Sequence, residues 1–165
     1  MFTYPVYCIA NIPVPVLETL LYEALTGSND LTPNSDFSLT VMTSVNQLST
    51  KASKPPLQPF SSPFIGQSVN EISLQLKGAT YFAVLDERSA KDKTVILGEF
   101  KDNKVETVRV TFHSAQSLLT ALYVGTLGFF EIQSAAAKTD GVYKQVKPEG
   151  QKKGGPAPRK MLPSR

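Results

Sequence analysis

The chain has 165 residues, and 41% of them are hydrophobic, so it can form one domain with a buried core and is not disordered throughout. One cysteine, Cys8, and one histidine, His113, exclude a disulfide framework and a zinc site built from several Cys and His ligands. The net charge of +3 is uneven: residues 144–165 carry seven Lys or Arg and one Glu, a charge of +6, whereas residues 1–143 carry ten basic and thirteen acidic side chains, a charge of −3.

The sequence contains no apolar run of the roughly 18–20 residues that a membrane-spanning helix needs. Its first residues, MFTYPVYCIANIPVPV, carry no basic side chain and are interrupted by Pro5, Pro13 and Pro15, which is unlike a secretory signal peptide. We therefore expect no membrane insertion and a cytoplasmic location, with the nucleus as the alternative.

A strand over residues 4–12 is the first element that the sequence predicts, because this run is mostly apolar and ends at Pro13. Pro15 suits the first position of a helix, where its missing N–H costs nothing. Apolar side chains then recur at helical spacing as far as Leu25, and Gly27 is expected to end the helix in the left-handed conformation.

The next segment, FSLTVMTS (37–44), alternates as a second strand does. Residues 45–63 then contain Ser, Thr, Asn, Gln and four prolines, too little apolar surface to offset the entropy cost of ordering. We interpret this stretch as a long surface insertion, a flexible connection in preference to a lid or docking loop.

Ser68 and Glu71 have the spacing of a capping box, which predicts a helix that continues to Gly78. Residues 72–76 also alternate in polarity, so a strand is the alternative there.

Three strands are predicted in the middle of the chain. TYFAVL (80–85) and TVILGEF (94–100) are apolar on both faces, which is typical of strands that are covered on both sides. VETVRVTF (105–112) alternates, and the short KDNK link makes it the antiparallel neighbour of the strand before it. DERSAKDK, between the first two, is predicted to be a charged turn.

Two helices and a final strand complete the predicted domain. Ser114 is expected to cap a helix that ends at Gly125, and a shorter helix follows over 129–138 with Phe129, Ile132 and Ala136 facing inward. Asp140-Gly141 forms a turn that leads into VYKQV, an edge strand.

The predicted fold class is therefore α/β, with α+β as the alternative: a single domain over residues 1–146, with a mixed sheet of five to six strands and helices packed on it. Residues 147–165 form a basic tail rich in Pro and Gly, which composition predicts to be disordered.

Several segments in the second half follow one another in a recognisable order: TYFAVLDERS, TVILGEF, VRVTF, SAQSLLTALYVG, FFEI and Asp140-Gly141-Val142-Tyr143. Over about residues 78–144 this order resembles the domain-of-unknown-function family 6924. Members of that family carry an Asn-rich stretch in the helix where this chain has Thr120-Ala121-Leu122. The family has no assigned activity, so the resemblance implies a fold and nothing about chemistry.

Asp86, Glu87, Arg88 and His113 are the candidate catalytic residues. The first three follow a predicted buried strand, and strand ends are where α/β folds place ligand sites. A carboxylate there acts as an acid or base if burial raises its pKa, and Asp86 is the first candidate because it leaves the strand first. Solvated turn residues are the favoured interpretation of all three. His113 lies at a strand-to-helix junction, where an exposed or capping histidine is favoured over a catalytic one. We predict no metal site and no cofactor.

The tail supplies the candidate partner-binding residues Lys152, Lys153, Arg159 and Lys160, whose charge attracts acidic or phosphate-bearing molecules. Because no catalytic motif is convincing, the leading hypothesis is a non-catalytic interaction or ligand-binding domain with a tail that docks on an acidic protein partner. A small enzyme or accessory factor for a hydrophobic metabolite is the first alternative. A nucleic-acid-associated or assembly protein that acts through the tail is the second.

Overall fold

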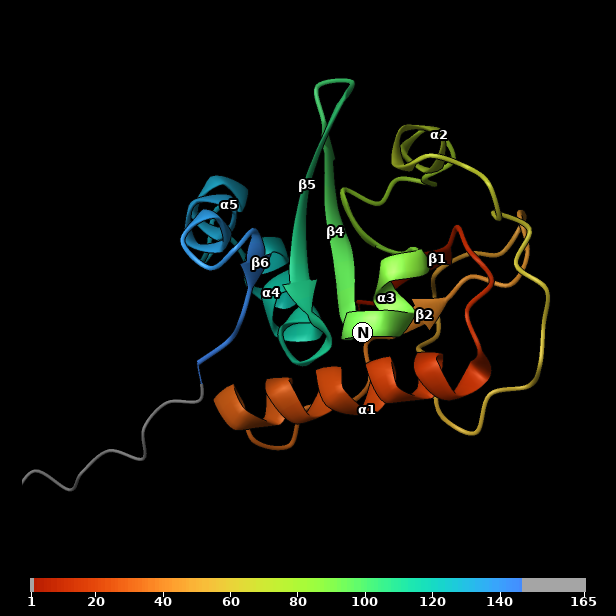
Figure 1. Ribbon diagram of the computed structural model, residues 1–165, viewed down its shortest axis with the longest axis horizontal. Helices are drawn as coiled ribbons and strands as arrows, with labels where there is room; N and C mark the ends of the chain where they lie inside the picture. The colour runs from red at the N-terminus through yellow and green to blue at the C-terminus, as the bar shows by residue number, and fades with distance from the viewer. Residues whose placement is uncertain (1, 147–165) are drawn as a thin grey trace, which may run out of the picture.

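The computed structural model describes residues 2–146, so the predicted disorder of 147–165 lies outside the described residues. The described chain forms six strands and five helices (Figure 1). In chain order they are β1 (Tyr4–Cys8), α1 (Val14–Leu31), β2 (Leu39–Val41), α2 (Val69–Ser73), β3 (Tyr81–Leu85), α3 (Glu87–Asp92), β4 (Thr94–Lys101), β5 (Lys104–Thr111), α4 (Phe112–Val124), α5 (Phe129–Ala137) and β6 (Val142–Tyr143).

The strands form one mixed sheet in the order β2-β1-β3-β4-β5-β6. β1 is parallel to both β2 and β3, β3–β4 and β4–β5 are antiparallel, and β6 is parallel to β5. The predicted mixed sheet of five to six strands with helices packed on it is confirmed, as are the antiparallel pairing of β4 with β5 and the edge position of β6.

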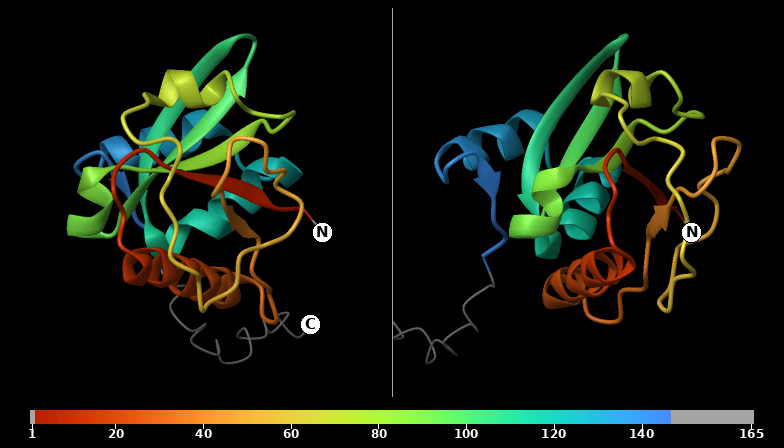
Figure 2. Two further views of the ribbon diagram at one scale, coloured as in Figure 1. Left: turned by 90° about the vertical axis from the view of Figure 1, so that its right-hand side faces the viewer. Right: turned by 45° about the vertical axis from the view of Figure 1, so that its right-hand side comes forward.

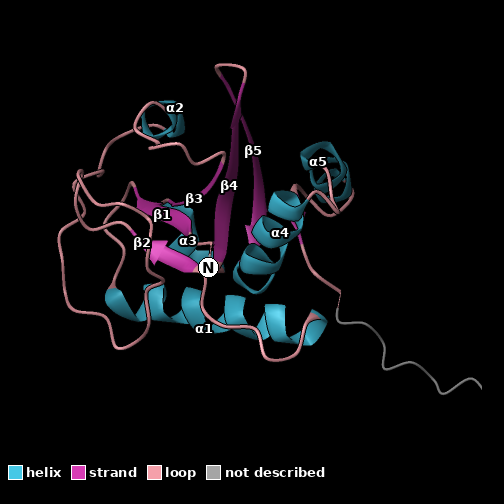
Figure 3. Cartoon of the chain, turned by 180° about the vertical axis from the view of Figure 1, so that it is seen from behind, coloured by secondary structure: helices cyan, strands magenta, loops and turns pink. Residues whose placement is uncertain are grey.

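Helices α1 and α4 pack on one face of the sheet, with α5 beside the β6 edge (Figure 3). The core on this side contains the inward residues of β1, β3, β4 and β5 together with Leu17, Leu20 and Leu21 of α1 and Leu119 of α4. All four leucines are almost completely buried, and each contributes roughly 1.5–3 kcal/mol of hydrophobic free energy on burial.

The opposite face carries a smaller apolar cluster, formed by Tyr7, Phe64, Ile72, Phe82 and Val84 with Met42. It is covered by α2 and by the long connection between β2 and α2. Phe82 and Val84 face this cluster while Ala83 and Leu85 face the larger core, so β3 is buried on both faces as its composition predicts.

Helix α1 does not end at Gly27 as predicted; it continues to Leu31. Gly27 is buried, and a Cβ atom built on it would lie 1.8 Å from the carbonyl oxygen of His113. The glycine is therefore needed for the close approach of α4 and not for a left-handed cap. Contact between two helices cannot be seen in the local sequence.

Three other local predictions are corrected. The segment predicted as a charged turn is helix α3, with Asp86 as its N-cap. Helix α4 begins at Phe112 with Thr111 as N-cap, so Ser114 lies inside the helix, where its hydroxyl accepts a hydrogen bond from the Gln145 N–H (2.8 Å). Ser68 caps α2 as predicted, but α2 ends at Ser73, before Gly78.

Residues 45–63 contain no helix or strand and lie on the surface, but they are held against the sheet at several points (Figure 2). The Ser53 N–H donates to the Leu39 carbonyl of β2 (2.8 Å), and the Ser62 hydroxyl donates to the Cys8 carbonyl (2.6 Å). The Leu57 N–H donates to the Glu18 carboxylate of α1 (2.9 Å). The predicted surface insertion thus covers the edge of β2, a device that protects an open sheet edge.

Candidate functional site

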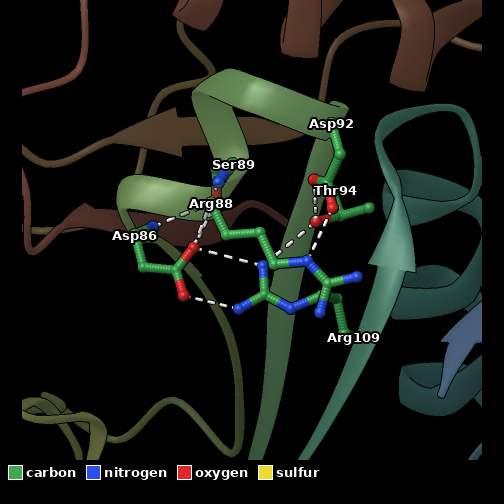
Figure 4. A network of polar contacts seen from close by, with 6 residues as sticks. All are labelled: Asp86, Arg88, Ser89, Asp92, Thr94 and Arg109. Atoms are coloured by element: carbon green, nitrogen blue, oxygen red, sulfur yellow. Dashed lines mark hydrogen bonds and ion pairs between the residues drawn. The ribbon is translucent and has the colours of Figure 1, made fainter.

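Asp86 and Arg109 form the centre of a polar network at the carboxyl end of β3 (Figure 4). The Arg109 guanidinium donates to both carboxylate oxygens of Asp86, at 3.1 Å from Nη1 and 2.5 Å from Nη2. Nη1 also donates to the Thr94 hydroxyl (3.0 Å), which donates to Asp92 (2.5 Å). The network joins α3 to strands β4 and β5.

Asp86 also forms the capping box of α3. Its Oδ1 accepts from the N–H of Ser89 (3.1 Å), while the Ser89 hydroxyl accepts from the N–H of Asp86 (3.0 Å). Burial raises the pKa of Asp86, but the hydrogen bonds and charge of Arg109, together with the bonds from Ser89, outweigh burial and lower the pKa below its usual value of 3.8. A carboxylate held in the ionised form in this way is suited to binding cations and capping a helix, and poorly suited to proton transfer at neutral pH.

Glu87 and Arg88 are exposed on α3, and the Arg88 Nε donates to Asp92 (2.6 Å), four residues further along the helix. With Asp86, they line a shallow hollow of about 500 Å³ beside Ile9 and Lys91. The structure therefore brings together three of the four candidate catalytic residues.

His113 is separate from the other three. It belongs to α4, on the face of the sheet that α1 covers, and its Nε2 lies 3.1 Å from the Asp30 carboxylate of α1. Arg109, the partner of Asp86, is paired in register with Ile96, which packs against the cluster on the opposite face. His113 thus joins two helices and lies apart from the Asp86 network.

Cys8 is buried in the larger core, and burial raises the pKa of its thiol to about 12. A thiol with such a pKa is protonated at neutral pH and is a poor nucleophile or metal ligand. Within residues 2–146 no group of three or more His, Cys, Asp or Glu side chains is arranged to hold a metal ion. None of the helices in that range combines the length and apolar composition that crossing a bilayer requires.

A deeper cleft lies at the opposite end of β3, where β1 and β3 begin. It has a volume of about 580 Å³ and is lined by segments 2–7, 42–50 and 75–81, with Phe64 and Tyr123. Strand β3 separates this cleft from Asp86 by five residues, roughly 17 Å of extended chain. The cleft is thus distinct from the hollow that contains the candidate catalytic residues.

Aromatic rings dominate the cleft. Tyr7 is fixed edge-on against Phe64 at a ring-centroid distance of 4.9 Å, and Phe2 lies 4.3 Å from Tyr123. Phe2 and Tyr123 are both exposed, as are Val45 and Leu48 in the 42–50 segment of the lining. Exposed apolar side chains gathered in a concave site are typical of a ligand-binding surface.

The wall made by residues 42–50 is held by side-chain hydrogen bonds. The Gln47 amide oxygen accepts from the Thr43 N–H (2.7 Å), and its Nε2 donates to the Val41 carbonyl (3.3 Å). The Thr3 hydroxyl donates to the Ser49 carbonyl (2.6 Å), which ties the wall to the residue before β1. These contacts hold the segment in place without regular secondary structure.

The sequence did not identify this cleft. Its walls come from the polar segment interpreted as a connection and from the residues around Gly78, neither of which contains a known motif. The available signal was Val45 and Leu48, two apolar residues in an otherwise polar stretch, but isolated surface apolar residues are common.

Comparison of the chain with protein-family models, with curated proteins and with solved structures found no match. The resemblance of residues 78–144 to family 6924 stays a prediction, and the case for function depends on the geometry of the site.

Proposed function

We propose that this protein is a non-catalytic ligand-binding domain that takes a small apolar ligand in the aromatic cleft at the amino ends of β1 and β3. The observation that carries the proposal is the cleft itself, about 580 Å³ and lined by six aromatic side chains. Its volume falls within the roughly 300–1,000 Å³ usual for small-molecule sites, whose walls are mostly apolar with a few polar groups.

The exposure of apolar residues in the cleft wall favours a ligand-binding site over a cavity without a ligand. Leu48 is 58% exposed and Phe2 is 63% exposed, so large apolar surfaces face the solvent at the cleft. Covering such surfaces with a ligand contributes about 25 cal/mol per Å² of apolar area.

Titration with the neutral fluorophore N-phenyl-1-naphthylamine tests the proposal. We expect one saturable site, and we expect Leu48→Asp to weaken binding at least about tenfold, because it places a carboxylate against the apolar ligand. Leu74→Asp is the matched control, since Leu74 is 80% exposed and does not line the cleft. Binding that does not saturate, or that both variants weaken equally, would contradict the proposal.

The second part of the proposal concerns the tail, which we propose docks on an acidic protein partner through Lys152, Lys153, Arg159 and Lys160 inside the cell. The support is the charge of +6 over residues 144–165 beside a domain of charge −3. The described chain is anchored just before it: the Gln145 amide donates to the Gly27 carbonyl (2.9 Å) and accepts from the Ser117 hydroxyl (2.6 Å). The cationic segment therefore begins from a fixed point beside α1.

Binding to poly-glutamate and to duplex DNA separates the partner classes. A variant with the four cations changed to Gln should lose poly-glutamate binding, and raising the salt concentration should weaken the binding of the native chain. Stronger binding to DNA, with a steep salt dependence, would favour the nucleic-acid alternative. Binding that does not change with the salt concentration would exclude both an acidic protein partner and nucleic acid as ligands held by the charge of the tail.

The hollow lined by Asp86, Glu87 and Arg88 supports a second candidate function, a small enzyme or accessory factor for a hydrophobic metabolite. Under this candidate, Asp86→Ala in a folded protein abolishes the cellular activity of the chain, whereas His113→Ala, outside the hollow, retains it. Full activity of the Asp86→Ala variant removes the hollow from consideration as a catalytic site.

A further inference from the structure

We propose that the ligand of the aromatic cleft is an amphipathic anion, an apolar body with one acidic group such as a carboxylate, and that Lys77 with the adjacent backbone N–H groups binds the acidic group. This inference rests on the proposed ligand-binding function and adds the chemical class of the ligand.

The charge of the residues that line the cleft favours an acidic ligand. Nineteen residues line the cleft; Lys77 is the one charged residue among them, and none is Asp or Glu. Lys77 is exposed, so its ammonium group is hydrated and ready to bind an anion. With no carboxylate in the lining to compete, an acidic ligand gains an attraction that a neutral or basic one does not.

The backbone beside Lys77 offers N–H groups that can bind the acidic group. The segment from Lys77 to Ala79 turns through Gly78, whose φ of +83° is in the left-handed region. Among the described residues, the N–H groups of Lys77, Gly78 and Ala79 donate no hydrogen bond to another backbone or side-chain group. Consecutive free N–H groups next to a left-handed glycine are a common anion-binding arrangement.

A hydroxyl donor in the cleft is consistent with the same kind of ligand. Tyr7 lines the cleft, and within residues 2–146 Ser38 Oγ is the one fully buried side-chain polar atom without a hydrogen-bond partner, so the Tyr7 hydroxyl is open to solvent although its ring is largely buried. Burial alone raises the pKa of Tyr7, so the hydroxyl remains a neutral donor. A ligand oxygen in the cleft can accept a hydrogen bond from this hydroxyl in place of water.

The aromatic wall accounts for the apolar body. The ring pairs Tyr7–Phe64 and Phe2–Tyr123 offer faces and edges to a flat ring or an alkyl chain. We therefore expect carboxylates of medium chain length, or aromatic carboxylates, to bind better than the corresponding alcohols.

Two probes with the same apolar body test the inference: 8-anilinonaphthalene-1-sulfonate, which is an anion, and neutral N-phenyl-1-naphthylamine. Lys77→Gln should weaken binding of the anion about fivefold, as loss of one partly exposed ion pair does, and should leave the neutral probe unchanged. Lys77→Arg should retain anion binding, and Lys104→Gln, which removes an exposed charge at the β4–β5 turn, should have no effect.

Competition extends the test to the proposed ligand class. Decanoate should displace the anionic probe at lower concentration than decanol, and added salt should reduce the difference. Co-sedimentation with phosphatidylglycerol vesicles at the expense of free decanoate binding would indicate a membrane lipid and overturn the assignment to a free small molecule.

The outcomes separate this inference from the proposed function. If the neutral probe saturates one site but Lys77→Gln changes neither probe, or changes both equally, the ligand-binding function stands and the acidic ligand is wrong. If neither probe saturates a site in the native chain, both proposals fail.

Discussion

Gly27 of α1 lies against the backbone carbonyl of His113 at the start of α4, so closely that a Cβ on Gly27 would be 1.8 Å from that oxygen. The two helices therefore touch at their backbones. The His113 imidazole lies 3.1 Å from Asp30, and Gln145 donates to the Gly27 carbonyl, so this one point ties together α1, α4 and the end of the described chain.

Replacing Gly27 by Ala should lower the free energy of unfolding by about 2 kcal/mol or more, because backbone atoms must move apart to admit a methyl group. Alanine favours a helix interior by up to about 1 kcal/mol over glycine, so the measured loss is a net value. Urea unfolding followed by circular dichroism measures it. Thr26→Ala, at an exposed neighbouring position, should change stability by about 0.5 kcal/mol or less, and an equally stable Gly27→Ala variant would contradict the contact.

Asp86→Asn should destabilise the protein by about 2 kcal/mol at pH 7, because asparagine keeps the N-cap of α3 but leaves the largely buried Arg109 guanidinium without its counter-charge. Glu87→Gln, an exposed change at the next residue, should cost about 0.5 kcal/mol or less.

The stabilisation that Asp86→Asn removes should depend on pH. The pKa of Asp86 is lower in the folded chain than in the unfolded chain, so its ionised form stabilises the fold above the unfolded-state pKa. This contribution is lost as the pH falls through the folded-state pKa. The stability difference between the native chain and Asp86→Asn should therefore be constant above about pH 5 and shrink in more acidic solution. A difference that stays constant down to the acid-unfolding range would show that the ion pair does not stabilise the fold.

The ring of Phe82 covers Gly98 on the neighbouring strand, and a Cβ on Gly98 would lie 2.3 Å from the ring Cζ. Gly98→Ala should cost about 1–3 kcal/mol of stability through overpacking. In a Phe82→Leu background the same change should cost less, since the shorter side chain leaves room for a methyl group. A double-mutant cycle measures this coupling, and strictly additive costs would contradict it.

Cys8 should be unreactive in the native protein. Burial raises the pKa of its thiol to about 12, so almost no thiolate is present at pH 8, and the side chain is about 1% exposed. Ellman's reagent should detect no thiol in the folded chain and one thiol in denaturant. Rapid labelling without denaturant would contradict the burial of β1.

Local patterns in the sequence were enough to predict most of the fold. Tyr81–Leu85 is apolar at every position, which requires cover on both faces of a strand, and KDNK permits only a tight antiparallel turn, formed with Asp102 and Asn103 at φ of 53° and 58°. Helix α5 follows its period of apolar residues, and Gly125 ends α4 in the left-handed conformation. These features depend on residues close together in the chain, so the sequence contains them.

The tertiary structure decided the remainder. Gly27 has the sequence context of a helix end, and only the approach of α4 makes it an interior residue. From the sequence, Asp86 is interpreted as a turn residue in preference to a catalytic acid, and only the structure shows that Arg109, 23 positions later, occupies both of its oxygens. The aromatic cleft joins segments from residues 2–7, 42–50 and 75–81. A one-dimensional pattern reports the spacing of neighbours along the chain, whereas charge pairing, close backbone contact and concave surfaces depend on distances in space.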